Sequence, residues 1–228
     1  AALEGIRNLV AVGIRPQVIM AVTRRTAPQV EALVRLAEEL GAGSVKFNLV
    51  QPTARGERMQ ERGETLSIEE LVELGRWVDS ELAERTELKL FYDYPLAFRP
   101  LGKIASGDGC GVCGVLNIMG VIATGHYALC GIGEHVPELV FGRVGEDPLE
   151  EVWRTSPVLN RLREGLPDDL GGICADCLMK GRCLGSCVAQ NQYRTGDLLA
   201  GFWFCEAAAE AGIFPLSRLA RAEVESGE

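Results

Sequence analysis

Cysteine is absent from the first 109 residues of this chain and then occurs eight times before residue 206. The densest part is the run Cys174-x2-Cys177-x5-Cys183-x3-Cys187, and Cys130 lies five residues after Gly125. The other cysteines are Cys110, Cys113 and Cys205. Eight thiols make two sets of four, and four thiolates are what a tetrahedral zinc or a cubane iron–sulfur cluster requires. The region after residue 109 is therefore predicted to fold around metal.

Disulfide bonds are the alternative use of eight cysteines. They occur mainly in short secreted chains with small hydrophobic cores, whereas this chain has 228 residues, of which 47% are hydrophobic. A core of that size is stable without cross-links. The Cys-x2-Cys spacing also directs two thiols toward a common centre, which favours a metal or a cluster over bridges between distant elements.

Spacing alone leaves both zinc and iron–sulfur clusters open, with clusters favoured. The two histidines, His126 and His135, lie outside the cysteine-dense run, which argues against a mixed Cys/His zinc site. Small residues also stand beside the thiols, and their backbone N–H groups can approach the sulfides of a cluster. These neighbours are Gly109, Gly111, Gly114, Gly181, Gly185 and Ser186. All-cysteine zinc sites lie on similar turns, so zinc remains the alternative metal.

Charge and hydropathy exclude two classes of partner. The formal net charge of −9 argues against a nucleic-acid-binding surface, which normally carries a basic patch. The longest apolar stretch, residues 115–123, is interrupted by Asn117 and Gly120 and is too short to span a membrane. We therefore expect a cytoplasmic protein without nucleic-acid or membrane partners. The chain begins at Ala1 directly with a helical pattern, and we expect it to be a piece of a longer protein.

The first 94 residues alternate between helical and strand patterns. The apolar run at residues 18–22 is typical of a strand buried on both faces, and further strands are predicted at residues 44–50 and 87–92. Capping boxes, Thr26-x-x-Gln29 and Ser67-x-x-Glu70, open the helices between these strands. Such alternation predicts an α/β domain with a parallel sheet. About 90 residues are too few for a closed eight-stranded barrel, so we expect half of a larger domain.

After Pro95 the pattern changes, because glycine and cysteine become frequent and long helical patterns are rare. Residues 116–123 and 126–129 flank Thr124-Gly125, which predicts a hairpin that presents Cys130 at its end. A third capping box is predicted at Asp147-x-x-Glu150, a glycine-rich loop at 174–187 and a helix at 206–222. The domains expected are therefore residues 1–94, residues 95–206, and a C-terminal helix and tail at 207–228.

The cysteine array resembles that of a known family. The order Cys-x(n)-Gly-x4-Cys, Cys-x2-Cys-x5-Cys-x3-Cys and a final Cys is similar to the SPASM domain of radical S-adenosylmethionine (SAM) enzymes, and it covers residues 110–205. Residues 1–94 resemble, less specifically, the last βα units of the radical SAM partial (β/α)6 barrel. Residues 141–153 resemble the linker between the family's cysteine groups. The implied fold is the second half of that barrel followed by a cysteine-rich α+β SPASM domain with a small β-hairpin.

The resemblance implies two auxiliary 4Fe–4S clusters. The first would be held by Cys110, Cys113, Cys130 and Cys187, and the second by Cys174, Cys177, Cys183 and Cys205. Cys187 would thus leave its own run to serve the other cluster, as the fourth cysteine does in two-cluster ferredoxins. Only two residues separate Cys110 from Cys113, and the pattern leaves open whether both of these thiols ligate.

The implied function is that of the C-terminal portion of an enzyme that modifies a ribosomally made peptide or a protein. The clusters would transfer electrons or hold the substrate, and a reductant protein would be a further partner. The sequence contains no Cys-x3-Cys-x2-Cys motif for a SAM-cleaving cluster, so SAM and a third 4Fe–4S cluster are expected only in the full-length enzyme, and no catalytic residue is assigned. The alternatives are a non-catalytic iron–sulfur carrier or peptide-binding scaffold that works with a separate enzyme, and a structural zinc module.

Overall fold

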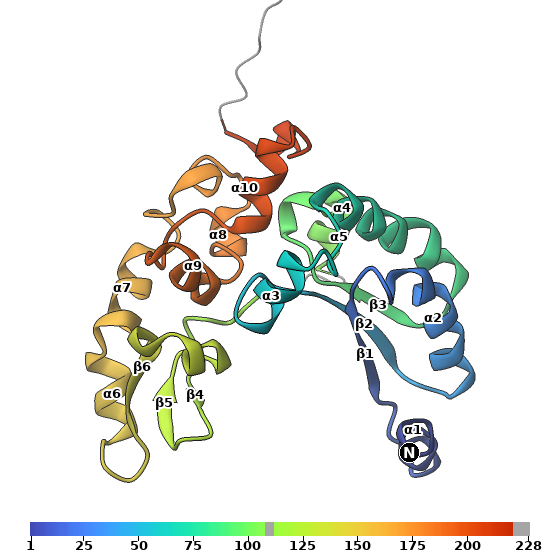
Figure 1. The fold of residues 1–228 in the computed structure, drawn as a ribbon, viewed down its shortest axis with the longest axis horizontal. Helices are drawn as coiled ribbons and strands as arrows, with labels where there is room; N and C mark the ends of the chain where they lie inside the picture. Colours follow the sequence, from blue (N-terminus) through green and yellow to red (C-terminus); the bar gives the residue numbers. More distant parts are fainter. Residues whose placement is uncertain (108–111, 221–228) are drawn as a thin grey trace, which may run out of the picture. The chain divides into compact units, whose positions relative to one another are not determined.

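The structure, a computed structural model, describes residues 1–107 and 112–220 and divides the chain into two compact units, Ala1–Gly111 and Val112–Glu228. Each unit contains one three-stranded sheet (Figure 1). Cys110 lies outside the described residues. Within the described ranges, none of the helices combines the length and the hydrophobicity that crossing a membrane requires.

The first unit is built on a parallel sheet in the order β1-β2-β3, which confirms the predicted α/β alternation. The strands are β1 (Gln17–Val22), β2 (Ser44–Leu49) and β3 (Lys89–Tyr92), and Ser44 pairs with both Gln17 and Lys89. The helices and turns around them are α1 (Ala2–Ala11), η1 (Ala27–Gln29), α2 (Val30–Glu39), α3 (Arg55–Glu61), α4 (Ile68–Trp77), η2 (Val78–Leu82), η3 (Ala83–Arg85), η4 (Leu96–Phe98) and α5 (Leu101–Ser106).

The core of this unit lies on one face of the sheet, where α2 and α4 cover it (Figure 1). Val45, Phe47 and Leu49 point to that face from β2 and are buried. The strand β1 differs from the prediction, because only Val22 is buried there and Ile19 is 58% exposed. The expectation of burial on both faces is wrong for this strand, since β1 is at the edge of the sheet and the described helices cover only one face.

A buried ion network fastens residues 95–106 to the first unit. Asp79, in the π-helical turn η2, is 6% exposed and accepts hydrogen bonds from Tyr94 Oη at 2.7 Å and Lys103 Nζ at 3.1 Å. Arg99 Nη1 lies 3.4 Å from the same carboxylate, and Arg99 also donates to the carbonyl of Tyr92. A buried carboxylate is stable only when it is paired in this way. The segment after β3 is therefore part of the first unit.

The three predicted capping boxes have different outcomes. Ser67 and Glu70 form the complete reciprocal box at the start of α4. Thr26 does not cap, because its Oγ1 donates to the carbonyl of Ala21 and a 3-10 turn precedes α2. Asp147 accepts the backbone N–H of Arg143. Short polar side chains bind whichever backbone group is nearest, and in these two turns that group is not at the helix start.

The second unit contains an antiparallel sheet and several short helices. Gly125, at φ +82°, makes the predicted turn between β4 (Gly120–Val121) and β5 (His126–Ala128). A third strand, β6 (Val140–Arg143), pairs with β5 and was not predicted. The other elements are η5 (Gly131–His135), η6 (Pro137–Leu139), α6 (Leu149–Thr155), α7 (Pro157–Gly165), η7 (Gly172–Cys174), α8 (Lys180–Cys183), α9 (Val188–Thr195), α10 (Trp203–Glu210) and η8 (Leu216–Arg218).

Two expectations for the second unit are wrong. The segment predicted as a loop at residues 174–187 contains the helix α8, begins at the last residue of η7, and is followed directly by the helix α9. The C-terminal helix predicted at 206–222 is the shorter α10, which ends at Glu210. Gly212, at φ +69°, and Pro215 follow, and both residue types interrupt a helix. Figure 1 shows α8, α9 and α10 at one end of this unit and the hairpin at the other.

Candidate metal centres

The structure brings together the three described thiols of the first predicted set. Cys113 is exposed and outside any helix or strand, Cys130 lies two residues after β5, and Cys187 is the residue that precedes α9. The pKa of the Cys187 thiol is raised to about 11, first by burial and then by the negative charges of Cys130 and Cys113. Burial and Cys130 likewise raise the pKa of Cys113. Thiols from three separate segments therefore interact with one another.

The four thiols of the second predicted set also interact. Cys174 ends η7, Cys177 follows it, Cys183 ends α8, and Cys205 lies in the first turn of α10. Burial raises the pKa of Cys205 well above its ordinary value, and the charges of Cys174, Cys183 and Cys177 add to this effect. Burial raises the pKa of Cys174 to about 11, and Cys183 and Cys177 again contribute.

Backbone N–H groups point at the sulfur atoms in both sets. The N–H of Phe202 donates to Sγ of Cys174 at 3.5 Å, and the N–H of Met179 donates to Sγ of Cys177 at 3.4 Å. Cys113 and Cys187 accept similar bonds from Val115 and Gln190, which lower their pKa values against the effect of burial. Such donors stabilise thiolate sulfur. The sites are thus built to hold negative charge on sulfur.

A turn with left-handed backbone angles lies between Cys183, which belongs to the second set, and Cys187, which belongs to the first. Cys183 and Cys187 are four residues apart, yet the thiols that act on Cys187 are those of Cys113 and Cys130. Between them, Leu184, Gly185 and Ser186 all have left-handed φ values of 53°, 72° and 58°. This conformation costs a non-glycine residue about 1–2 kcal/mol. The strained run thus lies between two consecutive cysteines whose thiols interact with different sets.

A carboxylate fixes the loop that carries Cys174 to the helix that carries Cys205. Oε1 of Glu206 accepts the backbone N–H of Ile173 at 2.9 Å. The carboxylate fits against two glycines, since a Cβ atom on Gly172 or Gly201 would lie 1.8 or 1.7 Å from Oε1. This clamp was missed from the sequence. Its signal is the pair of glycines, which have room for a carboxylate only because they lack a side chain.

The remaining candidates are placed as follows. The seven described cysteines are all unbridged, and Cys110 lies outside the described residues. His126 faces Thr124 at 2.8 Å across the hairpin turn. Among the residues that the structure describes, no three His, Cys, Asp or Glu side chains meet closely enough to hold a single metal ion. The electrostatic interactions within each thiol set therefore act over longer distances than those between ligands of one ion.

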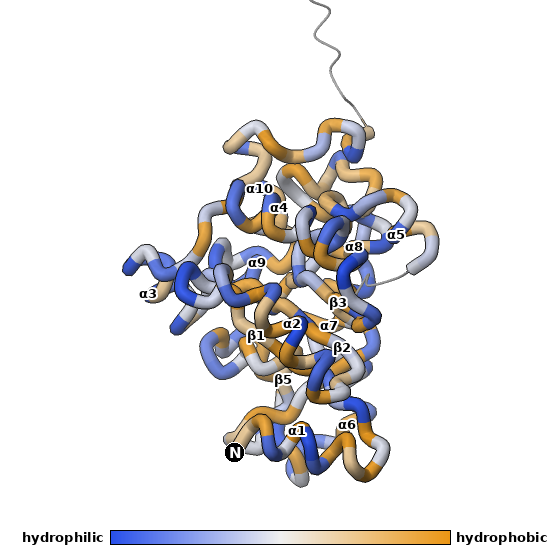
Figure 2. Tube along the Cα trace, turned by 90° about the vertical axis from the view of Figure 1, so that its right-hand side faces the viewer, coloured by the Kyte–Doolittle hydropathy of each residue, from blue (hydrophilic) through white to orange (hydrophobic). Residues whose placement is uncertain are grey.

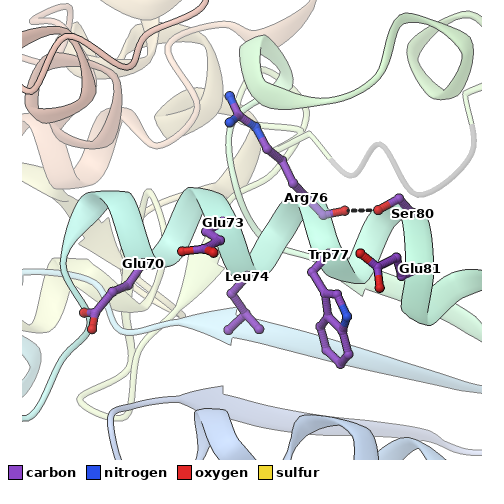
Figure 3. A pocket seen from close by; sticks show the side chains of 7 residues that line it. All are labelled: Glu70, Glu73, Leu74, Arg76, Trp77, Ser80 and Glu81. Carbon is purple, nitrogen blue, oxygen red and sulfur yellow. Dashed lines mark hydrogen bonds between the residues drawn. The ribbon is translucent and has the colours of Figure 1, made fainter.

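A shallow groove of about 480 Å³ runs along α4 and η2 in the first unit (Figure 3). Figure 3 shows Leu74 and Trp77 on the same side of the helix, while Ser80 Oγ donates to the carbonyl of Arg76 at 2.7 Å. The other lining residues are Glu70, Glu73 and Glu81. The groove is lined by one helical segment only, and we assign it no chemistry.

Comparison with known proteins agrees with the thiol arrangement. Residues 110–178 match the SPASM family, described as an iron–sulfur cluster-binding domain. An AdoMet-dependent heme synthase of Oleidesulfovibrio alaskensis is 25% identical over 87% of this chain and 53% of its own length. A PqqA peptide cyclase of Gluconobacter oxydans is 29% identical over 84% of this chain and 51% of its own length. A second PqqA peptide cyclase, from Rhizobium meliloti, is 26% identical over 78% of this chain and 45% of its own length. The chain thus spans about half the length of these relatives. Together, the matches and the ordered cysteines show that the chain is part of a radical SAM/SPASM protein.

Proposed function

We propose that this chain binds two 4Fe–4S clusters, the first through Cys110, Cys113, Cys130 and Cys187 and the second through Cys174, Cys177, Cys183 and Cys205. The observation that carries the proposal is the division of the described thiols into two interacting sets that cross within the Cys174–Cys187 run. When bound, such clusters supply one-electron chemistry at potentials that their surroundings adjust.

The residues present suit a cationic cluster core. In the second set, three of the four thiols are buried together, and neighbouring thiols raise the pKa values of Cys174 and Cys205, so that the thiolate forms need a compensating positive charge. Arg218 supplies some of this charge, since it lowers the pKa of Cys177 against burial. Iron would supply the rest, and the N–H groups of Phe202 and Met179 would donate to the ligand sulfurs.

We further propose that the first unit is the second half of a partial (β/α)6 barrel. Its helices α2 and α4 cover one face of the sheet, as they do on the outside of a barrel. The edge strand β1 leaves Ile19 exposed, and α1 has no buried residue although Leu3 and Leu9 lie in it. Figure 2 shows hydrophobic and hydrophilic residues mixed along α1. An additional strand beside β1 would cover this surface.

For the whole protein, we propose a radical SAM enzyme that modifies a peptide or a protein. Two of the relatives are named as peptide cyclases, which supports this substrate class. An iron–sulfur carrier or a peptide-binding scaffold is the alternative. The coding sequence upstream of Ala1 distinguishes them, because a Cys-x3-Cys-x2-Cys motif there supports the enzyme and a start codon beside Ala1 supports the carrier or the scaffold.

The test of the cluster proposal is metal and sulfide analysis after anaerobic purification and reconstitution. Two cubanes predict about eight iron atoms and about eight sulfide ions per chain, with the brown absorbance of iron–sulfur clusters. About two zinc ions per chain with no labile sulfide would instead establish the zinc alternative. Zinc must be measured in the same samples, so that an incompletely loaded cluster protein is not mistaken for a zinc protein.

A further inference from the structure

The side chain of Gln190 links the two thiol sets. Gln190 is 4% exposed and lies in α9, three residues after Cys187. Its backbone N–H donates to the carbonyl of Cys187 at 3.1 Å, and hydrogen bonding from its backbone and its side-chain amide lowers the pKa of the Cys187 thiol against the effect of burial. On the other side, Trp203 Nε1 donates to Oε1 of Gln190 at 2.7 Å. Trp203 begins α10, two residues before Cys205.

The indole of Trp203 determines which end of the amide faces sulfur. An indole N–H can only donate, so the amide atom opposite it must be the carbonyl oxygen. That choice leaves the NH₂ group of Gln190 to face Cys187 as a donor. Without the indole, the amide could turn its carbonyl oxygen toward the sulfur, where two electronegative atoms would repel each other. The ring itself is held against Phe202 and Phe204, at centroid distances of 5.8 and 5.5 Å.

We propose that Gln190 is the hydrogen-bond donor that raises the reduction potential of the first cluster, and that Trp203 is a positioning residue that acts through Gln190. The inference rests on the proposed cluster ligation by Cys187. A reduced cluster carries one more negative charge than an oxidised one, so a donor to its ligand sulfur stabilises the reduced form more. Because Trp203 shares α10 with Cys205, the second site thereby influences the first.

The size of the effect follows from the strength of one charge-assisted hydrogen bond. A bond that is about 1.4 kcal/mol stronger in the reduced cluster than in the oxidised one changes the reduction equilibrium about tenfold when it is lost, which is about 59 mV for a one-electron couple. We expect Gln190→Leu to lower one of two cluster potentials by about this amount. Trp203→Phe keeps an aromatic ring but removes the donor, and should lower the same potential by a smaller amount.

The experiment is a redox titration of the anaerobically reconstituted chain, followed by electron paramagnetic resonance. Four proteins accompany the wild type: Gln190→Leu, Trp203→Phe, the double variant, and Gln192→Leu. Gln192 is the matched control, since it lies on the same helix and is partly exposed. If Trp203 acts through Gln190, the double variant has the same potentials as Gln190→Leu alone.

Three outcomes would overturn the inference. These are unchanged potentials in Trp203→Phe, additive shifts in the double variant, or an equal shift in Gln192→Leu. If the Gln190→Leu variant fails to hold the first cluster, the reduction potentials of Trp203→Phe and Gln192→Leu still test the inference, because only the first of these two variants should shift the potential. Failure of the underlying ligation is recognised separately, because the wild type would then not contain about eight iron atoms per chain.

Discussion

Substitution of Gly201 by alanine should loosen the second site without touching a cysteine. The new Cβ would lie 1.7 Å from Oε1 of Glu206, so the carboxylate must leave its place. The N–H of Ile173 then loses its 2.9 Å hydrogen bond to a charged acceptor. Such a bond contributes about 1.5–3 kcal/mol. We take about 2 kcal/mol as the expected loss in the free energy that keeps the Cys174 loop closed.

The assay is the rate at which iron passes from the reconstituted chain to an excess of chelator under anaerobic conditions. If the loop must open before iron leaves, about 2 kcal/mol makes release from one cluster about thirtyfold faster. The matched control is Gly171→Ala, in the same loop, where the new Cβ would lie 3.6 Å from the nearest atom, an ordinary contact. We expect that variant to release iron at nearly the wild-type rate.

A second comparison tests the cause. Glu206→Ala should accelerate release as Gly201→Ala does, and combining the two should add nothing, because both remove the same contact. The reasoning is refuted if Gly201→Ala behaves like Gly171→Ala, or if the effects of Gly201→Ala and Glu206→Ala add.

Three further predictions concern other parts of the chain. Cys130→Ala should remove the first cluster and leave the second mostly intact, whereas Cys183→Ala should remove the second and also weaken the first, since the Cys174–Cys187 segment carries ligands of both. Iron and sulfide counts with spectra of both variants check this, and independent loss of one cluster in each would contradict it. Asp79→Ala should cost the first unit about 3–5 kcal/mol in unfolding free energy, because Arg99 is 4% exposed and loses its carboxylate. Urea unfolding against the exposed control Glu73→Ala measures this loss, and equal stability of the two variants would contradict it. The reduced chain supplied with SAM should release no 5′-deoxyadenosine above background, since its sequence has no Cys-x3-Cys-x2-Cys motif; steady turnover would contradict that expectation.

Much of the architecture could be predicted because its signals are local. The buried alternation of β2, the capping box of Ser67 and Glu70, and the glycine turn at Gly125 are all set by neighbouring residues. The exposure of β1 could not be predicted, because burial of an apolar strand depends on what lies beside it. The strand β6 is also determined by its partner β5, which is not adjacent in the sequence.

For the candidate sites, the cysteines could be predicted from the sequence, but the residues that position the cysteine-bearing segments could not. The spacing of the thiols in the sequence selects the residue types that bind metal. Glu206 and Gln190 have no such signal, since each acts through a contact more than ten residues away, with Ile173 and Trp203 respectively. Positive φ values at Leu184 and Ser186 are likewise invisible in the sequence, because neither residue type favours them.

The crossed ligation is the central claim, and anomalous scattering at the iron edge from an anaerobically grown crystal tests it most directly. The account predicts two iron clusters held by the eight cysteines, with Cys187 bonded to the cluster that Cys130 holds. Cys205 should be bonded to the cluster that Cys174, Cys177 and Cys183 hold. Cys187 bonded to the same cluster as Cys174 and Cys177, or scattering at the zinc edge in place of iron, would contradict it.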